Sequence, residues 1–140
     1  MRTTTTTLVI AAAVMCASVT YARQTAARTP TTVKDVMTTM TIPASDAVFD
    51  AAAEPPTSAE AWAALRKSAV TLEESGRLLM TDALAKDKNM WMDMARDLVR
   101  EAEATIKAAE AKDRNALEKA GDSVYLTCKA CHERYMAAVN

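Results

Sequence analysis

The sequence is poor in glycine, histidine and aromatic residues. Its 140 residues include two glycines and one histidine, and only 4% are aromatic. No stretch alternates apolar and polar residues as a half-buried strand does, and no internal repeat is present. Alanine, leucine, methionine, lysine and glutamate dominate the second half of the chain, which favours helices. The composition therefore argues against a sheet and predicts an all-α fold.

The chain also lacks an excess of either charge. Its formal net charge is −1, and acidic and basic residues are interspersed. Nothing in this pattern predicts nucleic acid or an anionic membrane surface as a partner. Half of the residues are hydrophobic, which is enough for one small domain with a single core.

No apolar run looks long enough to cross a bilayer. The stretch 8–17 follows Arg2 and a run of threonines, and small residues come after it. This pattern predicts a secretory signal over residues 1–22, cleaved after Ala22 or a few residues later. Cys16 also leaves open a lipoprotein signal, although the residues before it fit that pattern poorly. We expect an exported, periplasmic protein without stable membrane insertion.

The rest of the chain reads as a flexible lead-in over 23–31 and one domain over 32–140. Apolar residues recur there at spacings of three and four in four stretches, which predict helices. The stretches are 32–53, a second that begins after Thr57 as N-cap and runs to about 79, 90–111, and a last one that begins after Asp113. Pro43 predicts a kink or break in the first helix. Short links between four amphipathic helices predict an antiparallel up-down-up-down four-helix bundle.

The most specific motif is Cys128-Lys129-Ala130-Cys131-His132, close to the C-terminus. Cys-x-x-Cys-His is the attachment site of a c-type haem, in which two thiols form thioethers and the imidazole is an axial iron ligand. Residues i, i+3 and i+4 share one face of a helix, so all three side chains can meet one flat macrocycle. His132 is also the only histidine. The motif therefore predicts one covalent haem c, with its iron, on the C-terminal helix.

The motif has three alternative interpretations. A redox dithiol usually opens a helix that follows a strand, whereas this motif lies late in a helical pattern. A closed zinc site needs four ligands, and the only other cysteine lies in the predicted signal. A structural disulfide, or chance occurrence, is the third alternative.

A second axial ligand is predicted at the start of the first helix. In an antiparallel bundle the start of helix one lies beside the end of helix four, so Met37 and Met40 approach the end of the bundle that holds His132. A thioether from either residue would give His/Met ligation, and Met37 is preferred because it lies before Pro43. Methionine is also a common core residue, so both can be simple packing residues. Met90, Met92 and Met94 are expected to be core and surface residues at the opposite end of helix three, and one of them as the ligand is the less favoured alternative.

With these features the sequence resembles the class II c-type cytochromes, the group of cytochrome c′ and its low-spin relatives. The resemblance rests on Cys128-Lys129-Ala130-Cys131-His132 followed by Tyr135, on four helices, and on a methionine early in helix one. It covers roughly residues 31–139. It implies a periplasmic four-helix bundle with haem on the last helix, and Met37 takes the position of the distal ligand of the low-spin branch. Met136 stands where the family often has a basic residue, and Pro43 interrupts a helix that is usually continuous.

The leading functional prediction is a periplasmic electron carrier that meets redox partner proteins, with no enzymatic activity of its own. The alternative is a cytochrome c′-like protein with five-coordinate iron that binds NO or CO. A peroxidase-like reading lacks the distal His and Arg that such chemistry uses. Family members are often dimers, so a homodimer is one expected assembly.

Overall fold

The computed structural model describes residues 29–136. The predicted signal over 1–22, most of the lead-in and the last four residues lie outside this range. Residues 29–32 precede the first helix, and no strand occurs between residues 29 and 136. The predicted all-α class is therefore confirmed for the part of the chain that the structure describes.

Four helical stretches make up the fold. The first consists of α1 (Val33–Val36), a π-helical turn η1 (Met37–Thr41) and α2 (Ile42–Ala53), and α3 (Ala59–Leu79), α4 (Met90–Ala111) and α5 (Arg114–Tyr135) follow. The bounds predicted for the third stretch, 90–111, coincide with α4, and α5 begins directly after Asp113 as expected.

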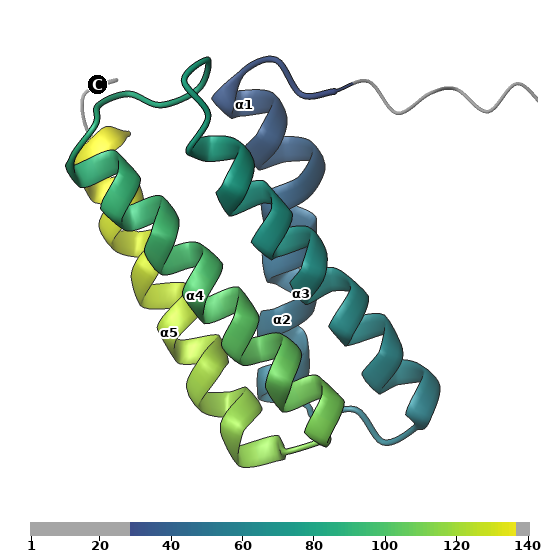
Figure 1. Ribbon diagram of the computed structural model, residues 1–140. Helices are drawn as coiled ribbons and strands as arrows, with labels where there is room; N and C mark the ends of the chain where they lie inside the picture. The colour runs from purple at the N-terminus through teal and green to yellow at the C-terminus, as the bar shows by residue number, and fades with distance from the viewer. Residues whose placement is uncertain (1–28, 137–140) are drawn as a thin grey trace, which may run out of the picture.

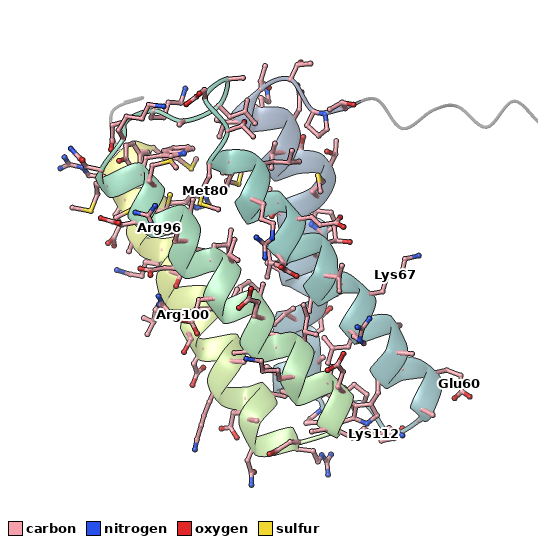
Figure 2. The ribbon with its side chains drawn as sticks, in the orientation of Figure 1. Glu60, Lys67, Met80, Arg96, Arg100 and Lys112 are labelled. Carbon is pink, nitrogen blue, oxygen red and sulfur yellow. The ribbon has the colours of Figure 1, made fainter. Side chains whose placement is uncertain are left out.

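The helices pack side by side, with α3 against α4, α4 against α5, and α2 against both α3 and α5. Figure 1 shows the links α2–α3 and α4–α5 at one end and the longer link 80–89 at the other, beside α1. The core consists of apolar residues from all four stretches, among them Val48, Leu72, Leu98 and Leu117. Charged side chains such as Glu60 and Lys67 point away from the helices (Figure 2). No described helix has the length and apolarity that a membrane crossing requires.

Polar side chains cap the N-termini of three of the helices, α1, α3 and α5. The Thr32 hydroxyl accepts from the Asp35 amide while Asp35 accepts from the Thr32 amide, which is a reciprocal capping box. Asp113 caps α5 by accepting from the Ala116 amide at 3.0 Å. The prediction of Thr57 as the cap of α3 is wrong. Ser58 is the N-cap and accepts from the Ala61 amide at 3.1 Å, because its extended backbone places the hydroxyl over the first turn.

The first stretch differs most from the prediction, because its first α-helix is only four residues long. The chain continues through η1, where the Ile42 amide donates to the Met37 carbonyl five residues earlier. Pro43 has no N–H, and in a regular helix its ring would press on the carbonyl four residues before it. The disruption expected at Pro43 is thus a π-turn, and the chain stays helical into α2.

Both glycines lie where two helices come very close. A Cβ at Gly121 would lie 2.6 Å from Ala52 Cβ, and one at Gly76 would lie 2.8 Å from Val99 Cγ2. Gly76 therefore permits a close approach of two helices, α3 and α4. Gly121 brings α5 equally close to α2.

Candidate functional site

A cavity of about 360 Å³ lies where the start of the first stretch, the end of α3, the start of α4 and the end of α5 meet. Its walls are mostly apolar. The lining residues are Met37 and Thr41 of η1, Ile42, Ser45 and Phe49 of α2, Leu79 of α3, Trp91, Met94, Ala95 and Leu98 of α4, and Tyr125, Thr127, Cys128, Lys129, Cys131 and His132 of α5. Every part of the Cys-x-x-Cys-His motif that carries chemistry is therefore on this cavity.

Helical spacing brings the three motif side chains to the cavity. Cys128, Cys131 and His132 occupy positions i, i+3 and i+4 of α5, which lie on one face of the helix. Both cysteines are free thiols and half-buried, and His132 is exposed. The two thiols line an apolar space while the imidazole remains accessible.

The chemistry of the thiols differs from that of a redox dithiol. Burial raises the pKa of Cys128 to about 11, with a smaller contribution from Cys131, and burial also raises the pKa of Cys131. Catalytic dithiols instead have a lowered pKa, since the thiolate is the attacking species. Between residues 29 and 136 no group of three or more His, Cys, Asp or Glu side chains is placed to bind a metal ion. An iron held in a porphyrin needs no such cluster, because its protein ligands are axial.

The structure separates the two candidate methionines of the first stretch. Met37 lines the cavity together with His132, and Met40 does not. Both are half-buried, so burial alone does not distinguish them. Of the two, Met37 is thus the one that shares the cavity with the predicted proximal ligand, and its ligation stays a prediction.

The placement predicted for Met94 is wrong. Met94 lines the same cavity, together with Trp91 and Leu98 of α4. The start of α4 lies beside the end of α5, since residues of both line the cavity and the two helices pack against each other. The argument that brought Met37 toward His132 applies equally to α4, and it would have found Met94. The cavity therefore contains a second thioether.

A hydrogen-bond network holds one wall of the cavity. The Tyr135 hydroxyl donates to Asp87 Oδ2 at 2.5 Å, and Asp87 Oδ1 accepts from the amides of Asn89 and Trp91 at 2.9 and 3.1 Å. The Trp91 indole N–H donates to the Leu79 carbonyl at 2.6 Å, and its ring meets the Tyr135 ring edge-on at a centroid distance of 4.9 Å. The hydrogen bond from Tyr135 is the main reason why the pKa of Asp87 is lowered. Tyr135 therefore acts on the cavity through Trp91.

The residues present fit a covalently attached haem. Two thiols, one imidazole and one or two thioethers reach a single cavity, and the other walls are largely apolar side chains such as Phe49 and Leu98. Sulfur for thioether bonds, nitrogen for one axial position and thioether sulfur for the other form the donor set of a His/Met c-type haem.

Comparison of the chain with models of protein families, with curated proteins and with solved structures gave no match.

Proposed function

We propose that this protein is a periplasmic c-type cytochrome of the class II kind that carries electrons between redox partner proteins. In this proposal the helices form an antiparallel up-down-up-down bundle. Cys128 and Cys131 would hold haem c through thioethers, and His132 and Met37 would be the protein ligands of its iron. The single observation that supports the proposal best is that all four residues line one apolar cavity. They come from the two ends of the described chain, so their meeting depends on the tertiary fold.

Each residue has a defined task. The two thiols, one helical turn apart on α5, would hold the haem at two points. When bound, haem supplies an iron that alternates between the ferric and ferrous states. His132 presents an imidazole nitrogen from the same helix. Met37 presents a thioether, which raises the reduction potential relative to a second nitrogen ligand.

The surrounding chain keeps this arrangement rigid. Phe49, Leu98 and Trp91 exclude water from the cavity walls, and a low-polarity surrounding disfavours an extra charge. Trp91 is itself held by the Leu79 carbonyl and by Asp87. A rigid site with two protein ligands changes little between oxidation states, which suits electron transfer better than substrate binding.

The test is the absorption spectrum of the purified, dithionite-reduced holoprotein with and without CO, for the unaltered protein and three single variants. We expect sharp α and β bands that CO does not change, and the same for Met40→Leu and Met94→Leu. Met37→Leu should give a high-spin spectrum that shifts with CO, because a leucine leaves the distal position open. Met40→Leu is the matched control, since it removes a half-buried methionine of the same stretch that does not line the cavity.

Other outcomes would change the proposal in defined ways. If the unaltered protein already binds CO, the five-coordinate NO- or CO-binding function replaces electron transport. If Met94→Leu alone opens the iron, the ligand is Met94 and the carrier function stands. The protein should also be produced in cells that export it and attach haem to c-type cytochromes. If it carries no covalent haem under these conditions, both functions are contradicted.

A further inference from the structure

The π-turn η1 changes which residues of the first stretch face inward. From Thr41 at the end of η1 into α2, the buried residues Thr41, Ala44, Ser45 and Val48 follow the three-and-four spacing of an α-helix. The buried residue before them, Val36, precedes Thr41 by five positions instead of three or four. The Thr41 hydroxyl donates to the Val36 carbonyl across this interval, at 3.4 Å. The chain between α1 and α2 therefore contains one residue more than a regular helix with the same buried face would have.

The same interval places Met37. Met37 and Ile42 are five residues apart, are joined by the Ile42 amide and the Met37 carbonyl, and both line the cavity. Successive residues of a regular helix are about 100° apart around its axis. Without the π-turn, the residue four before Ile42, Thr38, would face the cavity, and Met37 would turn by about 100° toward the core position of Val36. In the structure Thr38 is exposed, and its hydroxyl donates to the Lys34 carbonyl at 2.9 Å.

We propose that the π-turn Met37–Thr41 is a positioning element that selects Met37 as the distal sulfur ligand. It sets the face of the first stretch on which Met37 lies, and it leaves Thr38 and Met40 outside the cavity. Pro43 supports the turn, because it cannot supply the amide that the Thr39 carbonyl would accept in a regular helix. π-Turns of this kind recur at functional sites. This inference rests on the proposed function, because it explains how the chain delivers one ligand of the proposed haem.

The first test exchanges two adjacent residues and keeps the composition. In the variant Met37→Thr/Thr38→Met the sulfur moves by one position, to the residue that would face the cavity in a regular helix. If the π-turn sets the face, this methionine points to solvent. The reduced holoprotein should then become high-spin and bind CO, as expected for Met37→Leu. A low-spin, CO-insensitive spectrum of this variant would overturn the proposal.

The second test removes the extra residue. Deletion of Thr39 together with Pro43→Ala shortens the interval between Met37 and Ile42 from five residues to four. A regular helix is then possible, in which Met37 and Ile42 still lie on the same face. We expect a low-spin spectrum, no reaction with CO, and a far-ultraviolet circular dichroism signal at least as helical as that of the unaltered protein. A helical, haem-bearing variant that is high-spin would contradict the proposal. The two tests require opposite spectra, so a general loss of structure cannot produce both expected results.

Failure of this inference is distinguishable from failure of the proposed function. If the unaltered protein holds covalent haem but is five-coordinate, the positioning role is wrong and the protein remains a haem protein. If the unaltered protein holds no covalent haem, the proposed function itself is wrong.

Discussion

At the scale of single residues, Tyr135 connects the last helix to the link before α4. Its hydroxyl is bonded to Asp87, and Asp87 in turn holds the amides that begin α4. Tyr135 is not among the residues that line the cavity, although it follows His132 by only three positions. Its contribution is therefore to the position of Trp91.

Tyr135→Phe should lower the stability of the protein in a pH-dependent way. The pKa of Asp87 is lowered in the folded protein, chiefly by the hydrogen bond from Tyr135. A carboxyl group with a lowered pKa stabilises the fold above its unfolded pKa, and this contribution is lost as the pH falls through the folded pKa. The free energy of unfolding should thus differ between the two proteins at pH 7, and the difference should shrink below about pH 4.

Urea denaturation at pH 7 and at pH 3.5 measures this difference. Tyr125→Phe is the matched control, since the Tyr125 hydroxyl makes no hydrogen bond within residues 29–136. A constant difference at both pH values would mean that the loss comes from packing alone.

Single residues were predictable from the sequence where the chemistry is local. The Cys-x-x-Cys-His motif is contained in five consecutive residues, so its members could be named as one candidate site before the fold was known. Met94 and Trp91 could not be identified in the same way, because their place on the cavity depends on which helix ends meet. The same is true of Asp87, whose partner Tyr135 is far along the chain.

At the scale of helices, Gly121 fixes the distance between α2 and α5. The Cβ of an alanine there would come within 2.6 Å of Ala52 Cβ, an atom attached directly to the α2 backbone. The helices would have to separate, so Gly121→Ala should destabilise the protein by about 1–3 kcal/mol, as overpacking does. The gain of about 1 kcal/mol in helix propensity lessens the net loss.

A compensating change tests this explanation. Gly121→Ala/Ala52→Gly removes the atom that would clash, and should recover part of the lost stability. Thermal unfolding of the two single variants and the double variant gives the coupling between the positions. Additive effects would show that the two residues do not interact.

The helices themselves were largely predictable, because periodicity and caps are local signals. Those signals correctly bounded α4 and the start of α5. They misplaced the cap of α3 by one residue, since Thr57 and Ser58 are both good caps and only the backbone decides between them. Pro43 indicated a disruption but not its form. The form follows from packing, which holds Val36 and Thr41 on one face five residues apart.

At the scale of the whole molecule, the cavity joins the two ends of the described chain. Met37 lies in the second turn of the first stretch, and His132 lies near the end of α5. A group held by both would close most of the chain into a loop, which restricts the unfolded state. It would also fill an apolar space whose walls otherwise lack contacts.

The haem-loaded protein should therefore melt at a higher temperature than a haem-free form. The haem-free form is obtained with Cys128→Ala/Cys131→Ala, and calorimetry compares the two. A difference of about 1 kcal/mol corresponds to roughly 4–8 °C for a domain of this size, so a clear separation is expected. The unaltered chain produced without haem is the control and should melt close to the double variant. Equal melting temperatures with and without haem would argue against a ligand that bridges both ends.

The π-turn also determines where the gene can lose a single codon without disturbing the helix faces. A π-turn accommodates one residue more than a regular helix within a single turn. Loss of one codon from 38–40 would restore the regular spacing without turning the flanking residues, whereas loss of one codon inside α3, α4 or α5 would turn one part of the helix against the other by about 100°. Among the described helices, the segment 38–40 is thus the place where one residue can be lost while the same faces stay buried.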